Sequence, residues 1–164
     1  MPERQGIWNE IQALFTGYTK KENLREGDKK LRETYTADLG DARKKWESVL
    51  KAALDNNVAA DDARKAMNLM DRLANKVEHA DYGYAAWADR KGSIREEDLK
   101  KAFDYDQGLG ADLEAIKASA GQVYADCENS SFGLLAENAK KVKNALVEFE
   151  AKWDDREKAF GREF

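Results

Sequence analysis

The stretch from Ala63 to Trp87, ARKAMNLMDRLANKVEHADYGYAAW, carries the clearest pattern in the sequence. Its apolar residues recur in alternating steps of three and four, which places their side chains on one face of an α-helix. The positions on this stripe are Ala63, Ala66, Met70, Leu73, Val77, Ala80, Tyr84 and Trp87. Because such a stripe is stable only when it is removed from water, the stretch predicts a long helix packed against other helices.

The same spacing runs through residues 99–127 and 132–160, where Asp106 and Arg156 are the charged exceptions on otherwise apolar stripes. Residues 22–55 have a similar apolar face, which shifts sideways where two steps of four follow each other. The four predicted helices span about residues 22–55, 61–91, 94–127 and 131–161. Each is bounded by short glycine-containing or polar stretches that favour turns.

Links of only a few residues force neighbouring helices to run antiparallel. We therefore predict an all-α fold, an up-down-up-down four-helix bundle that forms one domain over residues 1–164. Heptad-like spacing over many turns favours shallow crossings of about 20°, as in coiled coils. The alternative is a three-helix bundle, or an extended hairpin that completes its core by dimerising.

Residues 1–20 form an appendage with a short amphipathic helix predicted over about residues 6–18. We call residues 7–18 the front segment. Its apolar face is formed by Ile7, Trp8, Ile11, Leu14, Phe15 and Tyr18. The face could dock on the chain's own bundle, which we favour, on a protein partner, or on a membrane surface. Its polar face lacks the Lys and Arg residues that membrane-surface helices usually carry.

Charge and cysteine content narrow the classes of partner and compartment. The 28 basic and 32 acidic residues leave a net charge of −4, which gives no field that attracts nucleic acid. Cys127 is the single cysteine, so no intrachain disulfide can form and a reducing compartment is favoured. No signal peptide or membrane-length apolar run is evident, and we expect a cytoplasmic protein.

The sequence DYDQGLGAD, from Asp104 to Asp112, interrupts a predicted helix with two glycines. It fails as a calcium loop, because Leu109 stands where an EF-hand needs glycine. It also fails as a phosphate cradle, because no strand precedes it. Counting from the turns places Gly40, Gly108 and Gly110 near the level of Trp153. We therefore expect a local weakening that allows a close approach or a kink beside that ring.

Asp106 and Arg156 fall within reach of one another by the same counting. They could form a buried pair that binds a ligand or sets the register, or a pair at the edge of the seam with its charges in water. We favour the second alternative. The sole histidine, His79, is predicted to be exposed, so no catalytic or metal-binding constellation, and no cofactor, is expected.

Aromatic residues gather at the end of the predicted bundle that holds both termini. The candidate residues of this aromatic end are Tyr35, Tyr84, Trp87, Phe103, Tyr105, Trp153 and Phe160. They could line a ligand pocket or a docking surface, or fill a wide part of the core, which we favour. The sequence therefore favours a non-catalytic interaction protein that binds itself or a protein partner through the front segment and this end. A membrane-anchored protein and a small-ligand carrier are the alternatives.

Overall fold

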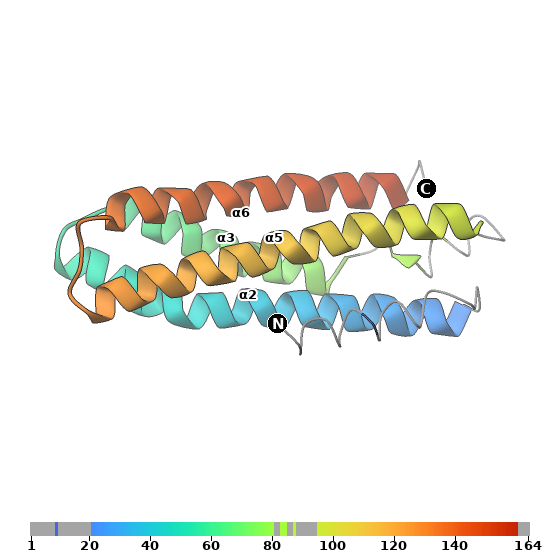
Figure 1. Ribbon diagram of the computed structural model, residues 1–164, viewed down its shortest axis with the longest axis horizontal. Coiled ribbons are helices and arrows are strands. Elements are labelled where there is room, and N and C mark those ends of the chain that lie inside the picture. The colour runs from blue at the N-terminus through green and yellow to red at the C-terminus, as the bar shows by residue number, and fades with distance from the viewer. Residues whose placement is uncertain (1–8, 10–20, 81–82, 85–86, 88–94, 161–164) are drawn as a thin grey trace.

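The computed structural model describes residues 9, 21–80, 83–84, 87 and 95–160. Over these residues it is all-helical, with no strand, and its four long helices pack on one another as a bundle (Figure 1). The helices are α2 (Lys21–Asp55), α3 (Ala60–Glu78), α5 (Glu96–Glu128) and α6 (Leu135–Lys158). The predicted four-helix bundle is therefore confirmed. The front segment lies outside the described residues.

The helices do not pack in chain order, because α3 and α5 are successive among the described helices but are not one of the closely packed pairs. Each helix packs against two neighbours, so that α2 contacts α3 and α5, and α6 contacts the same two helices. The α2–α3 turn and the α5–α6 turn lie together at one end of the bundle, on the left of Figure 1. We call this the two-turn end. The starts of α2 and α5 and the end of α6 lie at the opposite end.

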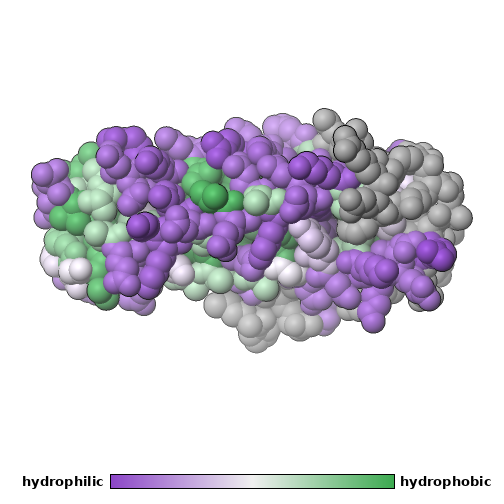
Figure 2. All heavy atoms as spheres, turned by 90° about the horizontal axis from the view of Figure 1, so that it is seen from above, coloured by the Kyte–Doolittle hydropathy of each residue, from purple (hydrophilic) through white to green (hydrophobic). Residues whose placement is uncertain are grey.

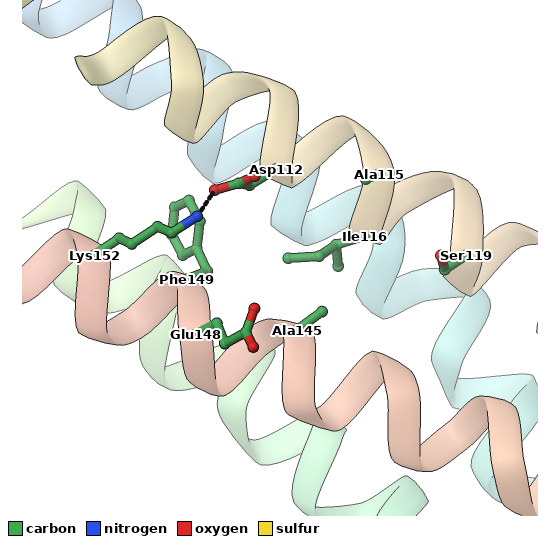
Figure 3. Close-up of a pocket in the computed structure, with 8 residues that line it drawn as sticks. All are labelled: Asp112, Ala115, Ile116, Ser119, Ala145, Glu148, Phe149 and Lys152. Carbon is green, nitrogen blue, oxygen red and sulfur yellow. Dashed lines mark hydrogen bonds and ion pairs between the residues drawn. The ribbon is translucent and has the colours of Figure 1, made fainter.

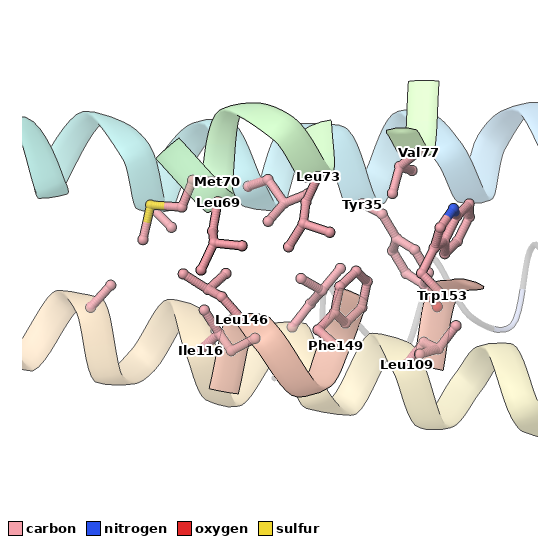
Figure 4. Packing of buried hydrophobic residues seen from close by; sticks show 14 of the residues in the cluster. Tyr35, Leu69, Met70, Leu73, Val77, Leu109, Ile116, Leu146, Phe149 and Trp153 are labelled. Carbon is pink, nitrogen blue, oxygen red and sulfur yellow. The ribbon is translucent and has the colours of Figure 1, made fainter. Parts of the chain in front are cut away.

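The core is built from the predicted stripes. On α3, for example, Ala63, Met70 and Leu73 are buried, and the large core residues of the other helices include Trp46 and Phe149. Figure 4 shows Leu73 of α3 and Phe149 of α6 pointing into the space between the helices. The Trp46 indole nitrogen also donates a hydrogen bond to the Ala63 carbonyl at 2.8 Å, so this large ring is buried without an unsatisfied donor.

Ion pairs between helices join every neighbouring pair on the outside of the bundle. They are Arg43–Asp71 between α2 and α3, Lys117–Asp38 between α2 and α5, Arg72–Glu150 between α3 and α6, and Lys152–Asp112 between α5 and α6. Asp38 is buried, whereas the other pairs are at least partly exposed, and exposed pairs contribute at most about 1 kcal/mol each. They fix which charged faces meet, while the buried apolar stripes supply most of the stability.

The helix predicted over residues 61–91 is too long at its carboxyl end, because α3 ends at Glu78. The next residue, His79, leaves helical geometry at φ −107° and ψ 21°. The carbonyl of Ala80 then accepts a hydrogen bond from Arg32 Nη1 of α2 at 2.6 Å. A side chain of the neighbouring helix thus satisfies a carbonyl just beyond the helix end, where intrahelical partners run out.

The apolar stripe nevertheless continues beyond this end. Tyr84 and Trp87 remain buried, and the Trp87 amide donates to the Gly83 carbonyl at 3.0 Å, which is the spacing of one helical turn. Apolar periodicity therefore predicted the buried face correctly and the continuity of the backbone wrongly. The other predicted boundaries agree closely with the structure, except that α6 begins four residues later than expected, at Leu135.

Among the described residues, no helix combines the length and the apolar character needed to cross a membrane.

Candidate functional site

The two charged residues on the apolar stripes form an ion pair inside the bundle. Arg156 Nε of α6 donates to Asp106 Oδ1 of α5 at 2.6 Å, and Arg156 Nη2 donates to Asp106 Oδ2 at 3.2 Å. Both side chains are 0% exposed. The expectation that their charges would lie in water at the edge of the seam is therefore wrong. Each residue occupies a core position of its stripe, which directs the side chain inward.

A third charged residue completes the pair from α2. Asp28 Oδ1 accepts from Arg156 Nη2 at 3.4 Å, and Asp28 Oδ2 lies 2.9 Å from Arg32 Nη2. Two arginines and two aspartates thus alternate in the order Arg32, Asp28, Arg156, Asp106, and their charges cancel. We call these four residues the ion cluster. It joins α2, α5 and α6 at one level of the bundle.

Two tyrosine hydroxyl groups also point at Asp106. Tyr84 donates to Asp106 Oδ2 at 2.8 Å, and Tyr35 donates to the backbone carbonyl of Asp106. Tyr84 follows α3 in the chain, so the cluster reaches the fourth side of the bundle. Asp106 therefore accepts hydrogen bonds from three parts of the chain, at its carboxylate from Arg156 and Tyr84 and at its backbone carbonyl from Tyr35.

Aromatic rings surround the Arg156 guanidinium. Its central carbon lies 4.5 Å from the ring centroid of Trp153, 4.6 Å from that of Phe160 and 5.9 Å from that of Tyr84. The Phe160 ring also meets Tyr84 and Trp87 edge-to-face, at centroid distances of 5.0 and 5.5 Å. Cation–π attraction compensates part of the lost hydration of the arginine.

The surroundings shift the pKa of three of these groups. Burial raises the pKa of the Asp28 carboxyl above its usual range, and the attraction of Arg156 and Arg32 offsets this only in part. Burial and the Asp106 charge raise the pKa of Tyr84 well above its ordinary value. Burial alone would lower the pKa of Arg156, but Asp106 and Asp28 raise it above its ordinary value. Arg156 is therefore charged and Tyr84 is a neutral donor at neutral pH.

Most residues of the predicted aromatic end belong to the core. Tyr35, Tyr84, Trp87, Phe103, Trp153 and Phe160 are buried, and only Tyr105 is half-buried. Tyr105 donates to the Lys152 carbonyl at 2.7 Å. The carrier hypothesis expects a closed polar cavity near Tyr84 and Tyr105. In the described part of the chain, the rings of Tyr84, Trp87 and Phe160 instead contact one another.

Close approach at a glycine occurs at Gly83, but not at two of the predicted positions, Gly40 and Gly108. A Cβ added at Gly40 or at Gly108 would meet no atom within 4 Å, so the predicted close approach is wrong for both. A Cβ added at Gly83 would lie 2.5 Å from Asp28 Oδ2. Gly83 therefore lets the chain after α3 lie directly against the Asp28 carboxylate.

Asp28, Arg32 and Gly83 were not predicted as site residues from the sequence. A signal for Asp28 was present, because it lies on the stripe of α2 between Leu24 and Leu31, at steps of four and three. A third charged residue on a core stripe, beside the two already noted, would have predicted a cluster rather than a pair. Arg32 follows Asp28 at the helical spacing of an ion pair.

The described residues line at least two cavities on the surface of the bundle. The smaller, about 130 Å³, lies between α5 and α6, where small residues such as Ala115 and Ala145 leave Ile116 and Phe149 as its floor (Figure 3). The 2.7 Å ion pair between Lys152 and Asp112 crosses one end of this cavity. A shallow groove with a few polar side chains offers contact area.

The larger cavity, about 570 Å³, lies along α2 where α3 has ended. It is lined by Arg25, Asp28, Lys29, Arg32, Glu33, Thr36, Ala37 and Glu78. Its cationic and anionic side chains are equal in number, so the cavity has no marked preference for a cation or an anion. Among the described residues, no group of three His, Cys, Asp or Glu side chains is placed to hold a metal ion.

The geometry thus defines an all-α four-helix bundle with an ion cluster in its core. Comparison with protein-family models, with curated proteins and with solved structures finds no match to this chain.

Proposed function

We propose that this chain is a non-catalytic helical-bundle protein that acts by interaction. It binds a protein partner, or a second copy of itself, through the front segment and the aromatic-rich end. We further propose that it acts in the cytoplasm, where a lone cysteine such as Cys127 stays reduced. The pKa of Cys127 is raised by burial and by neighbouring acids, which suits an unreactive thiol.

The observation that carries this proposal is the ion cluster. Its charges are matched within the core, and Tyr84 and Tyr35 complete the hydrogen bonds to Asp106. These polar groups hold helices together, and only Asp28 and Arg32 of the cluster also line the larger cavity. The ion cluster joins the helices at the aromatic end. Asp28 and Arg32 lie near the start of α2, and the front segment comes just before α2 in the chain. The apolar face of the front segment is the part suited to contact another molecule.

Sedimentation velocity over a range of concentrations tests this proposal, with the intact chain compared with the double variant Trp8→Glu, Ile11→Glu. We expect the intact chain to associate as its concentration rises and the variant to remain a monomer. A matched double variant on the polar face, Asn9→Glu with Gln12→Glu, should associate like the intact chain. The proposal of self-association is lost if all three chains are monomers at every concentration.

A partner protein is then tested by placing a photo-crosslinking residue at position 8 in cells, with position 9 as the control. A single product specific to position 8 supports a partner. Flotation with anionic vesicles decides the membrane alternative, because a membrane anchor would carry the intact chain upward and leave the Trp8→Glu, Ile11→Glu variant behind.

A further inference from the structure

Two of the three large apolar side chains that are exposed among the described residues lie at the two-turn end. Leu54, in the last turn of α2, is 50% exposed, and Leu134, just before α6, is 58% exposed. Val58 and Phe132, in the two turns themselves, are half-buried against the core. Figure 2 shows hydrophobic residues gathered over this end of the molecule. Gathered exposed apolar side chains of this kind are a common mark of a contact surface.

Acidic residues beside this apolar patch lie at the carboxyl ends of helices, where a negative charge is unfavourable. Asp55 ends α2, and Asp126 and Glu128 lie in the last turn of α5, and neither of these last turns contains a basic residue. The carboxyl end of a helix carries partial negative charge, so acids there are repelled. None of the three forms an ion pair within the described residues, and the Asp126 carboxylate accepts its hydrogen bond from the neutral Gln122.

The starting turns of the other two helices differ in this respect. At the start of α3, Asp62 is paired with Lys143, and in the first turn of α6, Glu137 is paired with Lys141. Acids are favourable at these amino ends, and they also have cationic partners. The unmatched negative charge of the two-turn end is therefore concentrated on the ends of α2 and α5, which are neighbours in the bundle.

Backbone strain is found in the same place. Asn57, Ala59 and Ser130 have φ values of 52°, 53° and 56°, and all three lie in the two turns. They are the non-glycine residues with positive φ in the described part of the chain. At Asn57 and Ser130 this left-handed conformation closes the ends of α2 and α5, where the next amides donate back to the helix. It is unfavourable for alanine, so Ala59 is the strained residue, and such strain is often kept where a surface has a function.

We infer that the two-turn end binds a cationic, apolar segment of a partner protein. Leucine or aromatic side chains of that segment would cover Leu54 and Leu134, and its Lys or Arg residues would lie over Asp55, Asp126 and Glu128. The charge selects this occupant, because the same end of a second copy, an anionic membrane or a nucleic acid would bring negative charge against negative charge. The inference rests on the proposed interaction function and adds a second surface to it.

Synthetic peptides test the inference on the full-length chain. The probe is a short peptide with leucine at helical spacing and lysine at its polar positions. Two matched peptides replace every lysine by glutamate, or every leucine by serine. Binding is followed by the backbone amide signals in heteronuclear NMR. We expect the lysine–leucine peptide to shift signals in residues 54–62 and 126–137, with little effect from either control peptide. No binding, or shifts elsewhere only, would overturn the inference.

Variants of the chain separate the two parts of the surface. Leu54→Ser with Leu134→Ser should weaken binding about tenfold or more, as the loss of buried apolar contacts predicts. Val147→Ser is the control, since Val147 is 49% exposed but lies in the middle of α6. Asp126→Asn with Glu128→Gln should weaken binding and reduce its dependence on salt, whereas Asp104→Asn, an exposed acid elsewhere on α5, should not. Equal binding by target and control variants would contradict the inference.

This test is independent of the front segment. If Trp8→Glu with Ile11→Glu abolishes association while peptide binding persists, the two-turn end binds the peptide independently of the front segment. If peptide binding fails while association through the front segment is retained, the proposed function stands and only this inference is lost.

Discussion

The Asp106 carboxylate of α5 and the Arg156 guanidinium of α6 form a two-point ion pair, with Nε–Oδ1 and Nη2–Oδ2 distances of 2.6 and 3.2 Å, inside the core. Removal of one partner leaves the other as a buried charge without its main counter-ion. We therefore expect Asp106→Leu or Arg156→Met alone to cost about 3 to 5 kcal/mol of unfolding free energy. Urea unfolding followed by circular dichroism measures this cost.

The double variant Asp106→Leu, Arg156→Met should lose less stability than either single variant, because neither charge remains to be desolvated. The exposed pair between Asp112 and Lys152 is the control, and Asp112→Asn should cost no more than about 1 kcal/mol. Costs that simply add in the double variant would show that the two side chains act independently.

Gly83 is placed where a methyl group has no room. A Cβ there would lie 2.5 Å from Asp28 Oδ2, and the carboxylate cannot move away without disturbing its contacts with Arg156 and Arg32. We expect Gly83→Ala to cost about 1 to 3 kcal/mol. Gly40→Ala and Gly108→Ala should instead gain up to about 1 kcal/mol each, since a Cβ there meets nothing within 4 Å and alanine favours the helix. Thermal unfolding of the three variants measures whether each one loses or gains stability.

Asp28 makes stability depend on pH in a direction opposite to that of most paired carboxylates. Burial raises its pKa in the folded state above the ordinary value of 3.8, so the folded state binds the proton more tightly than the unfolded state. The stability from this group is complete below about pH 4 and is lost as the pH rises through the raised pKa. Relative to Asp28→Asn, the wild-type chain should therefore lose stability over this interval.

Urea unfolding at steps of pH measures that difference, with Asp104→Asn as the control for loss of an exposed carboxylate. A wild-type chain that gains stability over Asp28→Asn as the pH rises would show that attraction to Arg156 and Arg32 outweighs burial.

The fold could be predicted because helical periodicity reports burial directly. Every residue of the predicted stripe on α3, from Ala63 to Val77, is buried, and the stripe on α6 is correct from Leu135 to Phe160, including the charged Arg156. Periodicity does not report backbone continuity, because a chain can leave the helix at His79 and return Tyr84 to the same face. The end of α3 depends on tertiary contacts, such as the hydrogen bond from Arg32 to Ala80.

The candidate site was predicted only in part for a similar reason. Counting from the turns brought Asp106 and Arg156 to one level, but it gave no measure of how deep they lie. Depth depends on the rings of Trp153 and Phe160 that cover the guanidinium, and these rings come from Arg156's own helix and its end. Asp28 could have been found by extending the stripe of α2 toward its start. Gly83 could not, because its role exists only against Asp28.

Ala59 is a site where the structure predicts a gain in stability. It precedes α3 with φ 53° and ψ 29°, a left-handed conformation that glycine adopts without steric cost. We expect Ala59→Gly to raise the unfolding free energy by about 0.5 to 1 kcal/mol, after the greater entropy of glycine in the unfolded chain is counted. Ala60→Gly, at the first helical residue, should give no such gain. Equal effects at the two positions would mean that the turn relaxes in solution.

The acids of the two-turn end link stability to the proposed second surface. Glu128→Lys places a positive charge at the carboxyl end of α5, where the helix dipole favours it, and should stabilise the chain by about 0.3 to 1 kcal/mol at low salt. The gain should shrink as salt screens the interaction.

The same substitution, Glu128→Lys, should weaken binding of the lysine–leucine peptide, because it adds a positive charge to a surface that binds a positively charged peptide. Glu97→Gln, an exposed acid in the first turn of the same helix, tests the dipole argument alone, since losing an acid there should be slightly unfavourable but should leave peptide binding unchanged. If Glu128→Lys stabilises the fold and peptide binding is retained, the acids only destabilise the chain and do not take part in binding. If binding weakens while stability rises, the unfavourable acids serve to bind the cationic partner.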